Sequence, residues 1–292
     1  MLCCAHRQED PSQAAVMVQR LCIVSVIAFL LLASGTSGHA GDRDIEDLLD
    51  QAIAGEHRSQ TNKARDQYRH PKETLVFFGL RPDMTVVEIW PGGGWYTEIL
   101  APVLRAHGKL HVARFALKAK DTPDFRKEVD AGYGALLAGN SDIYGKVVST
   151  ELEAPEFANI APAGSADLVL TFRNVHNWTK AGNDLATFKA FYKALKPGGI
   201  LGVVEHRARP GTPLPEMIRT GYMTEAYVIE LAEKAGFKLA SKSEINANAK
   251  DTKDHPKGVW TLPPTLRLGD TDRDKYLAIG ESDRMTLKFV KP

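Results

Sequence analysis

The sequence predicts a doubly wound, three-layer α/β domain, and two observations carry this prediction. Short apolar runs that are typical of strands alternate with helix-like segments from residue 85 onward. A run of three glycines, Gly92–Gly94, closely follows the first of these apolar runs. Apolar strands separated by helices form βαβ units, in which helices cover both faces of a parallel sheet.

Hydrophobic period and segment length give the expected elements. The predicted strands are 85–89, 109–114, 146–151, 166–172 and 200–206, and the predicted helices between them are 95–106, 124–138 and 183–195. A helix at 223–235 and two strands, within 236–245 and 284–292, complete the expected sheet. Residues 250–283 are polar and turn-rich, so we expect a hairpin-type excursion or a disordered loop between the last two strands.

An N-terminal helical lead-in, residues 44–80, precedes the first strand. Residues 44–56 carry an apolar stripe at helical spacing, with Asp44 placed to cap the helix. A charged loop and a short helix that ends at Gly79 follow. We expect the lead-in and the sheet to form a single domain, residues 41–292.

The overall charge gives no electrostatic case for a nucleic-acid partner. The chain has 292 residues, of which 43% are hydrophobic and 25% are charged, and its formal net charge is +1. This composition is that of an ordinary globular protein, so we expect a small-molecule partner and no nucleic acid. The oligomeric state does not follow from the sequence.

The first forty residues have the pattern of an export signal. Arg20 precedes the apolar run Leu21–Ala33, and a small-residue stretch follows and ends at Ala40. The apolar run is shorter than the roughly 20 residues that a transmembrane helix needs. We expect cleavage near Ala40, a periplasmic or secreted domain, and no stable membrane insertion after cleavage. Met17 is an alternative start, and an N-terminal membrane anchor is the alternative interpretation.

Metal and thiol chemistry are not expected in the exported part. Cys3, Cys4 and Cys22 all lie in the signal segment, which excludes disulfides, thiolate catalysis and cysteine-ligated metal after cleavage. None of the nine histidines belongs to an H-E-x-x-H motif. We therefore predict no metal site.

The glycine turn predicts a nucleotide-type ligand. In an open parallel sheet, ligands bind beyond the carboxyl ends of the strands, where the strand order reverses. Gly92 and Gly94 allow positive φ and remove the Cβ atoms that would keep a ligand from the backbone. Glu88, near the strand end, can accept hydrogen bonds from such a ligand. The alternative is a turn that only packs helix against strand.

The stretch "VVEIWPGGGWYTEIL" resembles motif I of the class I S-adenosylmethionine-dependent methyltransferases, acidic-x-Gly-x-Gly-x-Gly. Glu88 matches the acid, Gly92 and Gly94 match the second and third glycines, and Trp90 occupies the first glycine position. "SADLVLTFRNVHNW", "ALKPGGILGVVEHRA" and "GYMTEAYVIELAEKAGFKL" resemble later segments of the family, in the same order. "PGGGWYTEILAP" with "RNVHNW", and Tyr68–Pro71, most resemble a group of secreted methyltransferases of uncertain substrate.

The resemblance implies a Rossmann-like, mostly parallel sheet with an antiparallel last strand, and S-adenosylmethionine as cofactor. Glu88 and the glycines Gly92, Gly93 and Gly94 would lie at the amino-acid end of the cofactor. Glu151 or Glu153 would lie at its adenosine end. The family's second strand ends in an acid that binds the ribose hydroxyls. Arg114 stands there in this chain, and arginine cannot accept a hydrogen bond, so catalytic competence is open.

The loop after the fourth strand supplies the candidate catalytic residues. Methyl transfer depends mainly on positioning, with a base only where the acceptor must lose a proton. His176 is the candidate base, because its ordinary pKa suits neutral pH. Asn174 and Arg173 are candidates for orienting the substrate. The alternative for His176 is a structural histidine that is hydrogen-bonded within the loop.

Aromatic and basic side chains near these loops are candidates for substrate contacts or a lid. Aromatic faces attract cations such as a sulfonium, and N-terminal segments close the site in many members of the family. The candidates are Tyr68, Arg69, His70, Trp95, Tyr96, Arg173 and Trp178. The alternative is that the aromatic residues wedge the turn against the leading helix.

The sequence thus favours methyl transfer from S-adenosylmethionine to an unidentified small molecule. A non-catalytic exported binding protein that retains the fold is the main alternative. Arg114, Trp90 and the export signal favour it, since S-adenosylmethionine is made in the cytosol. An NAD(P)-dependent oxidoreductase is a weaker alternative, because the third glycine of G-x-G-x-x-G would fall at Thr97.

Overall fold

The computed structural model describes residues 40–119 and 122–292. The predicted signal peptide, residues 1–40, lies outside these residues except for Ala40, so export stays a prediction. The chain divides into two units after Arg43, and the second, Asp44–Pro292, contains the sheet. In the part of the chain that the structure describes, no helix has the length and apolar character that crossing a membrane requires.

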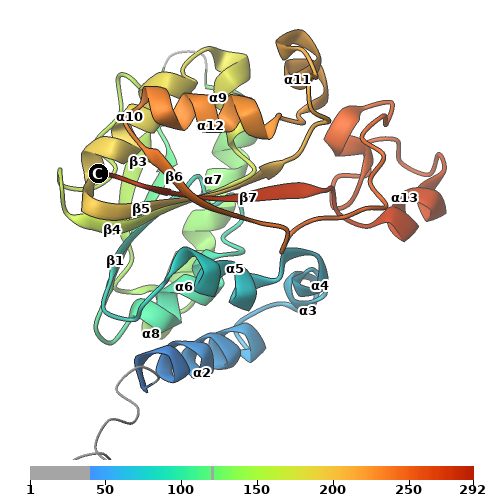
Figure 1. Cartoon of the computed structure of the whole chain (residues 1–292). Helices are drawn as coiled ribbons and strands as arrows, with labels where there is room; N and C mark the ends of the chain where they lie inside the picture. The colour runs from blue at the N-terminus through green and yellow to red at the C-terminus, as the bar shows by residue number, and fades with distance from the viewer. Residues whose placement is uncertain (1–39, 120–121) are drawn as a thin grey trace, which may run out of the picture. The chain divides into compact units, whose positions relative to one another are not determined.

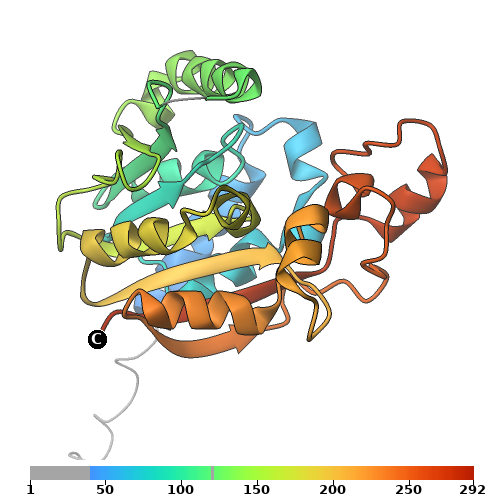
Figure 2. The same ribbon diagram turned by 90° about the horizontal axis from the view of Figure 1, so that it is seen from above.

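A seven-stranded sheet forms the centre of this unit (Figures 1 and 2). Its strands are β1 (Thr85–Ile89), β2 (Lys109–Phe115), β3 (Val148–Leu152), β4 (Ala166–Phe172), β5 (Leu195–His206), β6 (Lys238–Ser243) and β7 (Arg284–Val290). The spatial order is β3-β2-β1-β4-β5-β7-β6, and only β7 runs antiparallel to its neighbours. The predicted doubly wound sheet with an antiparallel last strand is confirmed.

Helices cover both faces of the sheet (Figure 1). They are α2 (Ala40–Ala54), α3 (Gln60–Lys63), α4 (Asp66–Arg69), α5 (Pro71–Phe78), α6 (Thr97–Leu104), α7 (Asp124–Gly139), α8 (Ser141–Tyr144), α9 (Val175–Ala181), α10 (Asp184–Ala194), α11 (Leu214–Thr220), α12 (Glu225–Lys234), the 3₁₀ helix η1 (Gly258–Thr261) and α13 (Arg273–Ile279). Helices α2, α5 and α6 pack on one face, and α9, α10 and α12 pack on the other.

The strands bury apolar side chains on both faces because successive residues point to opposite sides. On β4, Leu168 and Leu170 enter the core beneath α5 and α6, whereas Val169 enters the core beneath α10 and α12. β1 divides in the same way, with Val86 on one side and Val87 on the other. The near-continuous apolar runs of the sequence therefore correspond to central strands covered on both faces.

Two predicted elements differ from the structure. Residues 175–181, expected as a loop, form the short helix α9, which buries Val175, His176 and Trp178. The excursion between β6 and β7 contains η1 and α13 rather than the strands of a hairpin. Polar and turn residues mark where a strand ends, but they do not show that tertiary contacts will order the segment beyond it.

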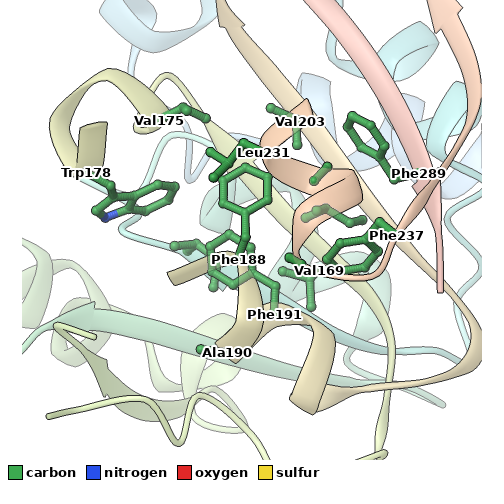
Figure 3. Close-up of a cluster of buried hydrophobic side chains, with 14 of the residues drawn as sticks. Val169, Val175, Trp178, Phe188, Ala190, Phe191, Val203, Leu231, Phe237 and Phe289 are labelled. Carbon is green, nitrogen blue, oxygen red and sulfur yellow. The ribbon is translucent and has the colours of Figure 1, made fainter. Parts of the chain in front are cut away.

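The core on the α9 side supplies a test of the packing. Figure 3 shows Trp178 against Phe188 and Phe191, and Trp178 is 1% exposed. We expect Trp178→Ala to lower the free energy of unfolding by about 3–5 kcal/mol in urea titrations. Trp178→Phe should cost less, because the indole N–H has no partner among the described residues. The control Phe125→Ala, at a side chain that is 59% exposed, should change stability by less than about 0.5 kcal/mol. Equal costs for Trp178→Ala and Phe125→Ala would contradict this packing.

Candidate functional site

A cavity of about 750 Å³ opens beyond the carboxyl ends of β1 and β4. The chain leaves β1 toward β2 and β3 on one side, and β4 begins the other half of the sheet, so the strand order reverses here. The cavity walls come from the turn after β1, the segment after β4, helix α11 and the excursion between β6 and β7. This is the position at which doubly wound sheets bind ligands.

The three glycines of the turn have different roles. Gly92 has a φ of +60°, borders the cavity, and has no atom within 4 Å of the place a Cβ would take. Gly94 has a φ of +86°, but a Cβ there would lie 2.3 Å from Leu136 Cδ2 on α7. Gly93 is exposed and is not part of the cavity wall. Gly92 therefore gives a ligand access to the backbone, whereas Gly94 allows α7 to pack against the turn.

Glu88 is the acid of the cavity wall. Its side chain is buried, and Thr97 Oγ1 donates a 2.6 Å hydrogen bond to Glu88 Oε2. Burial raises the pKa of Glu88 from 4.5 to about 7, because the loss of water outweighs the hydrogen bonds from the Thr97 hydroxyl and the Thr97 backbone N–H. A ligand cation at Glu88 would favour the ionised form.

A buried carboxylate orients His176 from behind. Glu205, at the end of β5, is 0% exposed and its Oε1 lies 3.1 Å from His176 Nδ1. The backbone N–H groups of Val175 and His206 also donate to Glu205, at 2.6 and 2.8 Å. With Nδ1 donating to the carboxylate, His176 Nε2 is the nitrogen left to accept a proton, and His176 borders the cavity. The arrangement is that of a general base held by an acid.

His176, Glu205 and His206 place possible metal ligands within 4.8 Å of one another. The Nδ1 atoms of both histidines and both Glu205 oxygens already take part in protein hydrogen bonds. Both Glu205 oxygens accept from backbone N–H groups, and His206 Nδ1 lies 2.5 Å from Ser282 Oγ. Burial, followed by the nearby His176, lowers the pKa of His206 well below its ordinary value. We assign the group to orienting His176 rather than to coordination.

Some of the other predicted site residues meet at the cavity. Asn174 borders it and donates from Nδ2 to Ile89 O at 3.1 Å, which ties β4 to β1. Tyr96 borders it as well, with its ring stacked 3.5 Å from that of Phe172. Trp95 also reaches it, but its indole N–H donates to Asn62 O at 3.0 Å and so wedges the turn against the lead-in.

Other predicted site residues lie elsewhere. Of the lead-in residues, Arg69 borders the cavity, whereas Tyr68 and His70 do not. The indole of Trp178, expected at the substrate, points into the hydrophobic core. Glu151 lines a second hollow, of about 720 Å³, near the ends of β2 and β3. The placement of Trp178 differs from the expectation because an aromatic residue near a strand end can face either side. The role expected of Glu151 stays a prediction, and Arg114 and Asp130 line the same hollow.

Arg114 also borders the second hollow, and it is paired with an acid. Its guanidinium binds the carboxylate of Asp130 on α7, at 2.8 and 2.6 Å. Asp130 therefore neutralises the Arg114 guanidinium near the end of β2. Glu153 binds Arg126 at 2.5 Å instead of facing an open space.

The indole of Trp90, which follows β1, packs beside the end of β2 and reaches the end of β3. Trp90 has a φ of +44° and packs at centroid distances of 4.9 Å from Phe115 and 5.2 Å from Trp178. Its indole N–H donates to Leu152 O at 3.0 Å. Trp90 borders the first cavity and Phe115 borders the second, so this aromatic contact lies between the two hollows.

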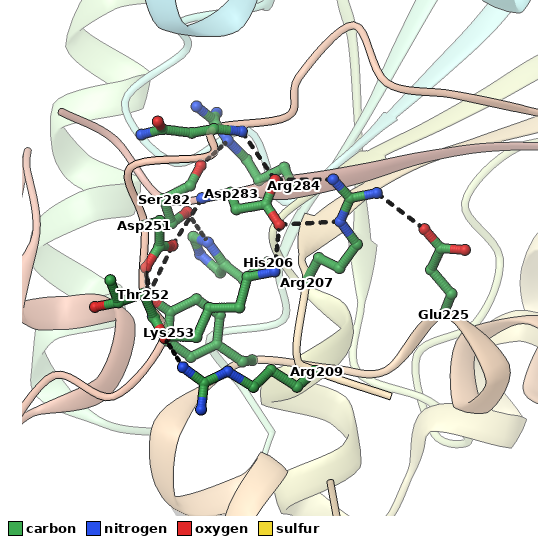
Figure 4. A network of polar contacts seen from close by, with 12 residues as sticks. His206, Arg207, Arg209, Glu225, Asp251, Thr252, Lys253, Ser282, Asp283 and Arg284 are labelled. Carbon is green, nitrogen blue, oxygen red and sulfur yellow. Dashed lines mark hydrogen bonds and ion pairs between the residues drawn. The ribbon is translucent and has the colours of Figure 1, made fainter. Parts of the chain in front are cut away.

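The excursion between β6 and β7 is anchored to the end of β5. Figure 4 shows Arg207, which binds Asp283 at 3.0 and 2.9 Å, and Asp283 also pairs with Lys253 at 2.7 Å. Asp251 accepts from the backbone N–H of Asp283 at 2.8 Å. These contacts fix the segment that carries Trp260 and Arg267 to the cavity wall, a contribution that the sequence did not signal.

Solved structures of low sequence identity share this fold. An S-adenosylmethionine-dependent methyltransferase from Aquifex aeolicus aligns with a TM-score of 0.51 and 16% identity, over 78% of this chain and 93% of that one. Geranyl diphosphate C-methyltransferase from Streptomyces coelicolor A3(2), in complex with Mg²⁺, geranyl diphosphate and S-adenosyl-L-homocysteine, aligns with a TM-score of 0.51 and 11% identity, over 82% and 87%. The [4+2]-cyclase SpnF gives 0.50 and 15%, over 88% and 96%. No family model and no curated sequence matches the chain.

The chain therefore has the class I methyltransferase fold. The cyclase among these structures is described by a different reaction, so the fold by itself does not determine the chemistry. The side chains at the switch point determine which reaction the fold supports.

The raised pKa of Glu88 predicts a pH-dependent loss of stability. The folded protein holds this proton more tightly than the unfolded chain, so stability falls as pH rises from about 4.5 through about 7. Relative to Glu88→Gln, the unfolding free energy of the wild type should fall by up to ~3 kcal/mol between about pH 4 and about pH 8. Urea titrations of both proteins measure this difference. Parallel pH profiles would show that Glu88 ionises in the folded state as it does in water.

Alanine substitutions should separate the two glycines. Gly92→Ala should cost about 1–2 kcal/mol, the usual cost of a left-handed conformation at a residue with a side chain. Gly94→Ala adds overpacking against Leu136 and should cost about 2–5 kcal/mol. S-adenosylhomocysteine affinity should fall in Gly92→Ala, because the added methyl group enters the cavity. Equal costs, or an unchanged affinity in Gly92→Ala, would contradict the assignment.

Proposed function

We propose that the protein transfers a methyl group from S-adenosylmethionine to a small-molecule acceptor. The observation that carries the proposal is the His176–Glu205 pair, which presents a base to a cavity at the switch point. The glycine turn borders the same cavity, and the neighbouring folds include methyltransferases. Turn, base and cavity together suit a reaction that depends on aligning two reactants.

The residues present fit the cofactor at its amino-acid end. The open space at Gly92 admits a ligand to the backbone, and Glu88 can accept from the cofactor's ammonium group. At the adenosine end, the carboxylate that the second strand lacks would come from Asp130, which lines the second hollow. The ribose hydroxyls can donate to it if the Trp90 indole moves from between the two hollows. Bound there, S-adenosylmethionine supplies a methyl group that is activated by the sulfonium.

The chain's own residues account for acceptor activation. His176 Nε2 takes the proton of an acceptor O–H or N–H group as the nucleophile attacks. Glu205 holds the imidazole at Nδ1 and stabilises the imidazolium that results. Trp260, whose ring lies 5.9 Å from that of His176, covers this side of the cavity.

A non-catalytic binding protein is the second candidate, and the packing of Trp90 favours it. The indole fills space near the ends of β1 and β2 and is held by a hydrogen bond to Leu152 O. Export, if it occurs as the sequence predicts, would also separate the protein from the cytosolic supply of S-adenosylmethionine. Under this alternative the cavity binds a ligand without turnover.

Cofactor binding is the first test of the proposal. We expect S-adenosylhomocysteine to bind the purified protein in calorimetric titrations, and Asp130→Asn to weaken binding about tenfold, since a hydrogen bond to a charged group contributes about 1.5–3 kcal/mol. Asp124→Asn is the matched control, because Asp124 lies on the same helix and its side chain is 90% exposed. A folded protein that fails to bind S-adenosylhomocysteine would leave the non-catalytic candidate.

Transfer of labelled methyl groups to a panel of phenols, amines and carboxylic acids tests the base. With an acceptor from this panel, His176→Gln should lower the rate roughly 10²–10⁴-fold, because the variant cannot take the proton. S-adenosylhomocysteine affinity should be nearly unchanged, since His176 acts on the acceptor. Wild-type rates in His176→Gln would assign His176 a structural role.

A further inference from the structure

Three arginines converge on one carboxylate behind the cavity. Glu281, which is 3% exposed, receives Arg65 Nε at 2.7 Å, Arg69 Nε at 3.0 Å and Arg284 Nη1 at 3.2 Å. One negative charge therefore faces three positive charges in a buried place. These cations hold the pKa of Glu281 down at about 2 against the effect of burial. The carboxylate is ionised, yet it leaves an excess of positive charge.

A fourth arginine brings that excess into the cavity. Arg173 follows β4, borders the cavity, and makes no side-chain hydrogen bond or ion pair within residues 45–119 and 122–292. Its backbone has a φ of +62°, and its N–H donates to Val204 O at 2.7 Å. A non-glycine residue in this conformation stores strain that surrounding structure must support, and such residues concentrate at functional sites.

Arg69 borders the same cavity and has one unused donor. The residue is 2% exposed, and its Nη2 is buried with no hydrogen-bond partner among the described residues. Its ring neighbour is Trp95, with the guanidinium 4.6 Å from the centroid. Burial and then the charge of Arg173 lower the pKa of Arg69 well below its ordinary value. Burial likewise lowers the pKa of Arg173 to about 10.

The remaining charges of the wall add to the imbalance. Lys180 and Arg267 lie exposed at the rim, whereas Arg219 is paired with Glu216. The acid of the wall is Glu88, which burial keeps largely protonated below about pH 7. Buried charge without a partner is costly in free energy, and each unpaired buried donor adds to that cost. An oxyanion in the cavity would neutralise the unpaired charge and accept from the unpaired donor.

We propose that the methyl acceptor carries a carboxylate or phosphate group, which binds between the Arg173 guanidinium and the free Nη2 of Arg69. The planar fork of arginine matches both oxyanions. The identification of the ligand as the acceptor rests on the proposed methyltransferase function. The anion site itself rests on the two arginines and the cavity.

The cofactor does not offset this charge. The amino-acid half of S-adenosylmethionine carries one carboxylate and one ammonium, and the sulfonium adds a positive charge. A bound cofactor therefore leaves the arginine excess in place or enlarges it, whereas an anionic acceptor neutralises it. The site should also select anionic acceptors over neutral ones. A neutral acceptor would leave both arginines desolvated and unpaired.

Calorimetric titration with benzoate and with inorganic phosphate, at constant ionic strength, tests the site without knowledge of the acceptor. We expect saturable binding of at least one of these oxyanions and none of neutral benzamide. Arg173→Gln should weaken oxyanion binding about 10–100-fold, and Arg173→Lys should weaken it less because the charge remains. Arg81→Gln is the control, since Arg81 lies away from the cavity and its side chain is 61% exposed. Benzoate without phosphate binding would identify a carboxylate site, and the reverse would identify a phosphate site.

Arg173→Gln removes an unpaired charge, so the ligand-free variant should melt at or above the wild-type temperature. A folded Arg173→Gln protein that binds both oxyanions as the wild type does would overturn the proposal, as would wild-type protein that binds neither.

Repeating the titration with saturating S-adenosylhomocysteine distinguishes acceptor from cofactor. We expect the oxyanion to bind alongside it. Mutual exclusion would mean that the arginines hold the cofactor's carboxylate, which would overturn the assignment to the acceptor. Binding of S-adenosylhomocysteine with no oxyanion site would overturn this inference and leave the proposed function. An oxyanion site without S-adenosylhomocysteine binding supports the anion site and overturns methyl transfer.

Discussion

The site depends on a single buried carboxylate, that of Glu205. It ends β5 in a place without water, where an ionised group must be hydrogen-bonded to be tolerated. The backbone N–H groups of Val175 and His206 and the ring of His176 supply those hydrogen bonds. The same contacts hold the start of α9 against β5 and fix which nitrogen of His176 faces the cavity. Stability and orientation of the base therefore come from one set of hydrogen bonds.

Around this pair, the fold divides the cavity into two regions of different character. On the β1 side, Gly92 exposes backbone, and Glu88 supplies a carboxyl that ionises near neutral pH. On the other side, Arg69 and Arg173 bring positive charge that the protein only partly neutralises. The excursion between β6 and β7 closes this region, held by the ion pair of Asp283 with Arg207. A cationic cofactor and an anionic acceptor would thus occupy regions of matching electrostatic character.

Helices and strands with a strong hydrophobic period could be predicted from the sequence. The tertiary contacts of individual side chains could not. β1 and β4 begin and end where the apolar runs do, because central strands are apolar throughout. The glycine turn and its place after β1 followed from the same reasoning. The role of Gly94 could not be predicted, because a glycine is needed equally for a close ligand and for a closely packed helix. Only the short distance from Gly94 to Leu136 shows that helix packing is the reason here. The ion pair of Asp130 with Arg114 was missed for a similar reason. Nothing in the sequence of a helix shows that its acid will contact an arginine 16 residues earlier.

The cluster at Glu281 was beyond sequence reasoning altogether. Glu281 and Arg69 lie 212 positions apart, and each reads as an ordinary charged residue in its own segment. His176 was found because its ordinary pKa suits a base at neutral pH, whereas its partner Glu205 was identified only in the structure. Local chemistry thus identified candidates, whereas the charge balance of the site required the folded chain.

A crystal structure of the protein with bound S-adenosylhomocysteine tests the central claim most directly. The account predicts the ligand in the cavity at the switch point, with its amino-acid end beside Gly92 and Glu88, its ribose toward Asp130, and its sulfur on the side that His176 Nε2 faces. A ligand bound away from this cavity would contradict the account. An adenosine half that makes no contact near Asp130, with the Trp90 indole still between the two hollows, would contradict it as well.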